Sequence, residues 1–193
     1  PEYRGYALRY ASNLLPGLVV IAPLAIYWYN MDRATSSFYG FSASKINLKT
    51  YFAILLLVAP VVCAASFGGD FQATYPRYKF GMPTDANSLA IPGFELCYGI
   101  DFVFVELLFR GFMVMAFTRY LGSGAILPMV VVYAFIHFQK PMGEAIGSVF
   151  GGIVLGVISY NTKSIYGGVI LHLGVAYMME AAGTLQMLYR SAH

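Results

Sequence analysis

The chain has 193 residues, of which 59% are hydrophobic and 11% are charged, and its net charge at neutral pH is +3. Soluble domains carry about 25% charged residues, so this composition excludes an ordinary soluble protein and predicts an all-α membrane protein. No basic cluster has the pattern of a nucleic-acid-binding surface, and we expect no nucleic acid among the partners.

Six stretches approach the roughly 20 apolar residues that a membrane-spanning helix needs. In chain order they are residues 13–29, 50–67, 92–120, 122–138, 142–160 and 164–188. The sequence therefore predicts a polytopic bundle of about six transmembrane helices. Two N-terminal helices with polar loops form one part, residues 1–91, and the other four form a core, residues 92–189.

The connection after the second stretch contains an aromatic and basic run at residues 75–80. Tyr, Lys and Arg side chains anchor well at the depth of lipid headgroups, so we predict that this run lies at the membrane interface. In the fifth stretch, Gly143, Gly147 and Gly151 recur every four residues and are followed by Gly152 and Gly156. Small residues on one helix face predict close packing against a neighbouring helix.

The third stretch is unusually polar, because it contains Glu106 and Arg110. A charged side chain at the bilayer centre costs roughly 2.5–3.5 kcal/mol on insertion scales, so such residues usually pair inside the protein. Their four-residue spacing places both on one helix face, within reach of an ion pair. Asp101 lies five residues before Glu106, roughly 140° around the helix, and is expected to meet another helix or water.

Two histidines lie in neighbouring stretches. His137 ends the fourth stretch, with Tyr133 one turn before it, and His172 lies in the sixth. A Glu can act as a base toward water while a His donates a proton or stabilises an oxyanion. With Glu106 and Arg110, the two histidines predict a buried reaction site.

Two further acidic residues are candidates for the surroundings of this site. Glu144 begins the fifth stretch close to His137, where it either orients the imidazole or lies in headgroup water. Glu180 follows His172 by eight residues, roughly 80° around the helix, and could flank the same cavity. Both are predicted as cavity or supporting residues, together with Tyr133 and Asp101.

A metal site would use the same residues. Glu106, His137 and His172 could supply the two-His, one-carboxylate set of a catalytic zinc ion with an open position for water. The sequence has no His-Glu-x-x-His pair on one helix, so we expect no cofactor, with zinc as the alternative.

Three segments together resemble the CPBP family of intramembrane proteases, which includes the type II CaaX prenyl proteases and bacteriocin-processing proteins. The family motif Glu-Glu-x-x-x-Arg is matched by Val105-Glu-Leu-Leu-Phe-Arg110. The second motif, an aromatic residue before a His, is matched by Tyr133-Ala-Phe-Ile-His137. The third, His-x-x-x-Asn, is matched by His172-Leu-Gly-Val-Ala176. The run that begins His137-Phe-Gln-Lys-Pro141 is similar to the His-Phe-Gly-Lys-Pro form of a bacterial branch.

The resemblance covers about residues 94–180 and has two departures. The first Glu, which the family uses to activate water, is Val105 here, and the Asn assigned to oxyanion stabilisation is Ala176. What carries over implies four roles. Glu106 would activate water with the help of His137, while His172 would stabilise the oxyanion and Arg110 would hold Glu106.

The function implied is an intramembrane endopeptidase that processes a membrane-associated peptide or protein terminus, such as a prenylated C-terminus, a leader peptide or a sorting tail. The departures leave open a noncatalytic CPBP-like subunit of a membrane complex. A third reading has His137 or His172 ligating a haem or chlorophyll-type pigment. We expect an integral protein of a bacterial inner membrane, with lipid, a peptide substrate and further membrane subunits as partners.

Overall fold

The computed structural model describes residues 2–34, 37–42, 46–79 and 90–192. Within these residues the chain is helical and contains no strand. The α-helices are α1 (Glu2–Tyr27), α2 (Leu48–Ala65), α3 (Gly69–Thr74), α4 (Ala90–Glu106), α5 (Thr118–Leu121), α6 (Ile126–Phe135), α7 (Met142–Thr162) and α8 (Tyr166–Ser191). Two π-helices, η1 (Trp28–Asp32) and η3 (Leu107–Ala116), continue α1 and α4, and two 3₁₀ turns are η2 (Arg77–Lys79) and η4 (Gly122–Ala125).

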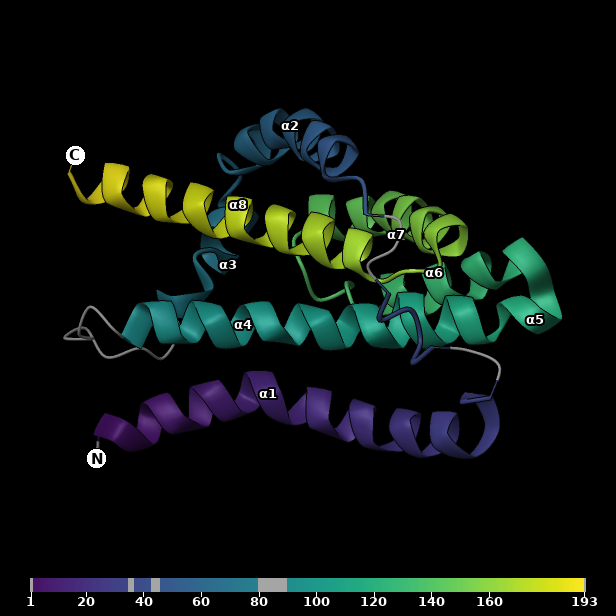
Figure 1. Ribbon diagram of the computed structural model, residues 1–193. Helices are drawn as coiled ribbons and strands as arrows, with labels where there is room; N and C mark the ends of the chain where they lie inside the picture. The colour runs from purple at the N-terminus through teal and green to yellow at the C-terminus, as the bar shows by residue number, and fades with distance from the viewer. Residues whose placement is uncertain (1, 35–36, 43–45, 80–89, 193) are drawn as a thin grey trace.

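The long helices lie in a row. Helix α4 packs between α1 on one side and α8 on the other, and α2 covers the far side of α8 (Figure 1). Helices α6 and α7 pack against each other and against η3, the continuation of α4. The core of the predicted four-helix region is therefore built around the place where α4 changes into η3.

Four helical segments are long and apolar enough to cross a membrane: Tyr10–Asp32, Leu48–Ala65, Met142–Thr162 and Tyr166–Ser191. Only 11% to 33% of each apolar window is buried inside the protein, so most of these side chains face outward. An outward apolar surface of this extent suits contact with lipid. The prediction of an all-α membrane bundle is confirmed, and the chain is an integral membrane protein.

The third and fourth predicted spans differ from the other four. The third is one continuous helical rod that changes from α to π geometry at Leu107. The fourth contains the short 3₁₀ turn η4 and the 10-residue helix α6, and α6 is about 15 Å long and reaches half-way across a hydrocarbon core. Its apolar run is longer than its helix because the chain leaves helical geometry after Phe135 and turns at residues 136–140.

The π geometry of η3 gives its buried residues a five-residue spacing. Leu107 and Phe112 pack in one apolar cluster, and Phe109 and Val114 are buried in another. A π-helix has i→i+5 hydrogen bonds, so residues five apart lie on one face. The α-helical spacing assumed from the sequence therefore does not apply between residues 107 and 116.

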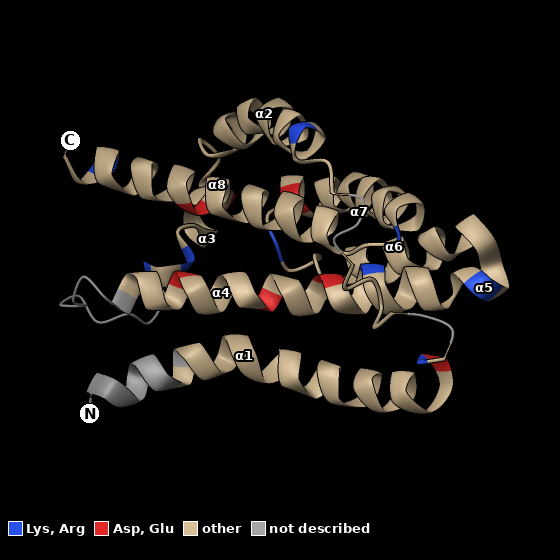
Figure 2. Cartoon of the chain, viewed as in Figure 1, with Lys and Arg blue, Asp and Glu red and all other residues tan. Residues whose placement is uncertain are grey.

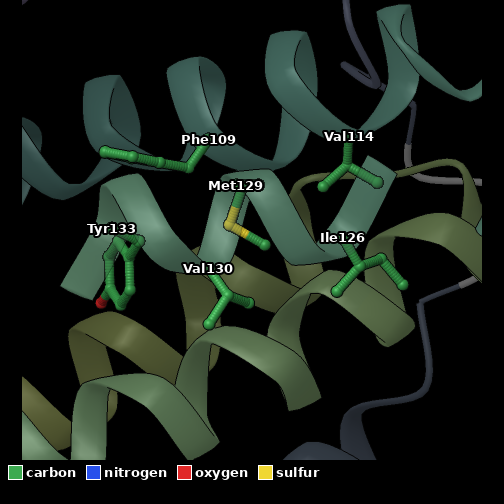
Figure 3. Close-up of a cluster of buried hydrophobic side chains, with 6 residues drawn as sticks. All are labelled: Phe109, Val114, Ile126, Met129, Val130 and Tyr133. Carbon is green, nitrogen blue, oxygen red and sulfur yellow. The ribbon is translucent and has the colours of Figure 1, made fainter. Parts of the chain in front are cut away.

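Helix α6 packs against η3 through a cluster of buried side chains (Figure 3). Its members are Phe109 and Val114 from η3 and Ile126, Met129, Val130 and Tyr133 from α6. Because η3 and α6 are joined through α5 and η4 as an antiparallel pair, this cluster fixes which residues of α4 and α6 lie level with each other.

Helix α7 approaches the same cluster through two of the five predicted glycines. A Cβ atom on Gly156 would lie 2.8 Å from Met129 Cε, and one on Gly152 would lie 3.3 Å from the Tyr133 ring. Gly143, Gly147 and Gly151 have nothing within 4 Å of such an atom. Of the five predicted glycines, Gly152 and Gly156 therefore form the close packing face, and the other three do not.

Candidate active site

The Glu106 and Arg110 side chains form a fully enclosed ion pair at the junction of α4 and η3. Arg110 Nη1 donates to Glu106 Oε1 at 2.8 Å, and both side chains are 0% exposed. This is the pair that the four-residue spacing predicted. Glu106 Oε2 and Arg110 Nε and Nη2 have no hydrogen-bond partner among the described residues.

His172 joins this pair from α8. Its Nδ1 lies 2.9 Å from Glu106 Oε1, and its Nε2 lies 3.2 Å from the Tyr133 hydroxyl oxygen. Phe102, one turn before Glu106, places its ring edge-on to the imidazole with the two centroids 4.5 Å apart. A carboxylate only accepts hydrogen bonds, so Nδ1 carries the proton. His172 therefore links α4, α6 and α8 at one point.

Gly168 makes the approach of Glu106 to α8 sterically feasible. A Cβ atom at this position would overlap Glu106 Oε2. Gly168 lies one helical turn before His172, so both face α4. The sequence reasoning did not identify Gly168, although its four-residue spacing from His172 was a usable signal.

Tyr133 connects the two histidines. Its backbone oxygen lies 2.8 Å from His137 Nδ1, and its hydroxyl meets His172. Its ring lies under the Arg110 guanidinium, 4.2 Å from ring centroid to Cζ, which is a cation–π contact. Tyr133 thus holds three of the four predicted catalytic residues in one arrangement.

The hydrogen bond of His137 determines its tautomer. A carbonyl oxygen can only accept, so Nδ1 must carry the proton and donate to Tyr133. In the neutral imidazole, Nε2 is then an unprotonated acceptor. His137 lies in the turn after α6 and is 9% exposed. Burial lowers the pKa of His137, against the opposing effect of the Tyr133 carbonyl, and keeps the neutral form at physiological pH.

Glu144 and Glu180 bind a different segment from the one that the sequence suggested. The Tyr75 hydroxyl donates to Glu144 Oε2 at 2.7 Å, and Lys140 Nζ donates to Oε1 at 3.1 Å. The backbone N–H of Arg77 donates to both oxygens of Glu180, at 2.8 and 3.0 Å. Neither carboxylate has a hydrogen bond to His137 or His172 in the described part of the chain.

The segment that these carboxylates hold is the described part, residues 75–79, of the aromatic and basic run. Tyr75 is 2% exposed, and Gly183 gives it room, because a Cβ atom there would lie 2.7 Å from Tyr75 Cβ. Burial first, and then the charges of Tyr98 and Glu144, raise the pKa of the Tyr75 phenol. Instead of exposing its aromatic side chains to headgroups, the segment folds inward because two carboxylates and a glycine accommodate it.

Asp101 is half-buried on α4 and has a different environment from Glu106. The charges that act on it belong to His172 and Lys140. Figure 2 shows several acidic positions along α4 in helices that otherwise carry few charges. Asp101 lies near the proposed site, but outside the hydrogen-bonded group of Glu106, His172 and Tyr133.

The two departures from the CPBP motifs are both packed into apolar surroundings. Ala176 is buried with Phe94 and Tyr98, and Val105 packs against the cluster that contains Tyr133. Neither position is left as a gap in the site.

The donor set does not fit the predicted zinc site. Among the described residues, no group of three His, Cys, Asp or Glu side chains lies close enough to hold a metal ion. His172 Nδ1 and His137 Nδ1 are both directed to protein oxygens.

The comparisons with known proteins give a family for the region that contains the site. Residues 91–178 match the family model described as type II CAAX prenyl endopeptidase Rce1-like. No curated protein and no solved structure matches the chain. The matched residues include all four predicted catalytic side chains, Glu106, Arg110, His137 and His172. Residues 91–178 are therefore similar to the Rce1-like type II CAAX prenyl endopeptidase family, a protease family consistent with the predicted CPBP resemblance.

Proposed function

We propose that the chain is an intramembrane endopeptidase that hydrolyses a peptide bond in a membrane-associated peptide or protein terminus. The observation that carries the proposal is the state of His137. Its Nδ1 donates to the Tyr133 carbonyl oxygen, so the neutral ring presents Nε2 as a proton acceptor. The family match supports peptide hydrolysis in general.

In this mechanism His137 Nε2 accepts a proton from water as the water oxygen attacks the carbonyl carbon. The peptide C–N bond then breaks, and the same proton passes from His137 to the leaving nitrogen. The lowered pKa of His137 suits this role, because the acceptor form is present at neutral pH and the protonated form is a ready acid.

Glu106 has a positioning role in this proposal, whereas the motif resemblance gave it the water. Its Oε1 receives both Arg110 and His172, and its side chain is 0% exposed. A carboxylate enclosed in this way is placed to hold His172 and is shielded from a substrate. Glu106 Oε2, which has no partner among the described residues, faces Gly168.

His172 and Tyr133 together supply a hydrogen-bond donor for the oxyanion. The His172 side chain is 14% exposed, in contrast to the enclosed Glu106. Because the Nδ1 proton of His172 is directed to Glu106, its Nε2 accepts from the Tyr133 hydroxyl. The same hydroxyl turns its proton to the developing charge, an interaction of the kind that lowers hydrolytic barriers most.

The test uses the full chain in proteoliposomes with two internally quenched peptides. One ends in a Cys-aliphatic-aliphatic-X sequence with a farnesylated Cys, and the other is the same peptide without the lipid. We expect cleavage by the native chain and a loss of about 100-fold or more for His137→Ala and Glu106→Gln. Glu95→Gln is the control, because Glu95 lies on α4 but has no contact with either His in the described structure. Unchanged turnover in both site variants would remove the proposal.

A second candidate, a noncatalytic CPBP-like subunit, is favoured by the packing of the two motif departures. Ala176 and Val105 contribute to apolar clusters, as expected where the family's polar groups are no longer required. A stoichiometric partner in a pull-down from membranes, together with no effect of His137→Ala on any cleavage, would support this candidate over the enzyme.

A further inference from the structure

Asp101 lies on the face of α4 that points into the protein. Phe94, Tyr98, Asp101 and Val105 follow one another at spacings of four, three and four residues, which is one stripe of the α-helix α4. Phe94 and Tyr98 are buried in one cluster, and Phe109 is buried in another, against which Val105 packs. Asp101 therefore occupies an inward position between two pieces of core.

Asp101 nevertheless keeps intermediate exposure, unlike Phe94 and Tyr98 on the same stripe, which are buried. No hydrogen bond or ion pair of Asp101 is present in the described structure. A carboxylate that points inward, remains reachable by solvent and has no bonded partner is unusual in an apolar bundle, where charges are normally paired. This combination indicates that the Asp101 carboxylate binds a molecule other than the protein itself.

The neighbours of Asp101 belong to the proposed site. His172 and Lys140 are the charges that act on it, and the ring of Phe102, the next residue, packs on the His172 imidazole. Lys140 and His172 also act on His137. Eight residues after Asp101, Phe109 contacts Tyr133 with ring centroids 5.2 Å apart, and His137 and Lys140 follow Tyr133 by four and seven residues.

We infer that Asp101 is a further catalytic residue, which accepts a hydrogen bond from the nucleophilic water while His137 Nε2 takes its other proton. This inference rests on the proposed hydrolysis. Asp101 remains a carboxylate throughout, because the transferred proton passes from water to His137 and then to the leaving nitrogen. Its negative charge orients the water and stabilises the protonated His137.

Of the other charged groups near this point, Lys140 is held by Glu144, and Glu106 is enclosed by Arg110 and His172. Glu144 is in turn bonded by Lys140 and Tyr75, so Asp101 is the partly exposed carboxylate of this region that has no bonded partner among the described residues. Asp101 lies one turn before Val105 on the same face of α4. It therefore supplies, from the preceding turn, the carboxylate that is absent at position 105.

The first arm of the test measures turnover of the farnesylated peptide by Asp101→Asn and Glu95→Gln, two variants that each remove one half-buried charge from α4. We expect kcat to fall about 100-fold in Asp101→Asn with KM little changed, and to stay within about twofold in Glu95→Gln. Asp101→Glu should recover part of the loss. Full activity of Asp101→Asn, while His137→Ala is inactive, would overturn the inference and leave the proposed function standing.

The second arm needs no substrate. The chain has three histidines, so histidine-selective ¹⁵N NMR in micelles resolves few signals. Removing the Asp101 charge should lower the pKa of a site imidazole by about half to one pH unit, and Glu95→Gln should not. Identical titrations in Asp101→Asn and the native chain would overturn the inference even if neither peptide is cleaved.

Discussion

Glu106 and Glu180 are both carboxylates buried in the bundle, but they are satisfied in opposite ways. Glu106 receives two side-chain donors on one oxygen, from Arg110 and His172. Glu180 receives a single backbone N–H, that of Arg77, on both oxygens. The first arrangement gathers charged and titratable groups, whereas the second fastens a connecting segment. Burial of an acidic residue in a membrane protein therefore does not by itself mark a reaction site, and the identity of the donors is more informative.

The largest effect expected from this comparison is on stability. Glu106→Leu leaves the fully enclosed Arg110 without its carboxylate and should lower the free energy of unfolding by about 3–5 kcal/mol. Glu180→Leu leaves one buried N–H unsatisfied and should cost about 1–3 kcal/mol. Unfolding in mixed micelles measures both. The double variant Glu106→Leu/Arg110→Met should recover most of the first loss, and equal losses in the two single variants would contradict the distinction.

Gly168 provides a test specific to the Glu106 region. Gly168→Ala should displace the Glu106 carboxylate, because the added methyl would overlap Oε2. Overpacking of this kind costs about 1–3 kcal/mol, and we expect peptide cleavage to be lost with it. The matched control is Gly147→Ala on α7, where the methyl meets nothing within 4 Å. If both variants kept full activity, the close approach of Glu106 to α8 would have no functional role.

Two tyrosine hydroxyls, one at the Glu106 site and one in the segment that Glu144 and Glu180 hold, distinguish these two regions through smaller effects. Tyr133→Phe removes the bond to His172 but keeps the ring under Arg110. It should reduce turnover about tenfold, and the unfolding free energy by about 0.5–1.5 kcal/mol. Tyr75→Phe removes the bond to Glu144 and should have a similar stability cost with unchanged turnover. Equal turnover of the two variants would show that the Tyr133 hydroxyl takes no part in hydrolysis.

The smallest expected effect is the pH dependence of cleavage. Burial lowers the pKa of His137, so its Nε2 remains an acceptor as the pH falls through the usual histidine range. Cleavage should decline only below that range. Stability should decline in the same direction, because the unfolded chain binds the proton more readily than the folded one. A profile of kcat/KM against pH measures this decline, which forms the acid limb of the profile. An acid limb at or above the ordinary histidine pKa would exclude neutral His137 as the base.

Much of the site geometry could be predicted from residue spacing, because it depends on contacts within a helix or between helices that carry the motifs. The Glu106–Arg110 pair follows from a four-residue step. Tyr133 and His137 are also four residues apart and hydrogen-bonded, although His137 lies in the turn after α6. The meeting of His172 with Glu106 was expected from the motif order, while the catalytic roles of these residues stay predictions.

The partners of Glu144 and Glu180 could not be predicted in this way. Both bind residues 75–79, more than sixty positions away in the chain. No helical periodicity indicates that such a segment folds inward. The short α6 was also missed, because apolar character continues through Ile136 after the helix has ended at Phe135. Hydropathy reports which side chains avoid water and does not report where the backbone turns.

The π-helix η3 has a consequence for how this chain is aligned with its relatives. A helical wheel drawn at 100° per residue through α4 goes out of phase within residues 107–116, because buried neighbours there are five apart. A one-residue deletion in this stretch would return it to α geometry. The chain from Phe117 onward would then turn by about one residue's rotation relative to Glu106. A relative that lacks one residue here would keep the motif letters but present a differently rotated η3–α6 hairpin to the histidine of α8.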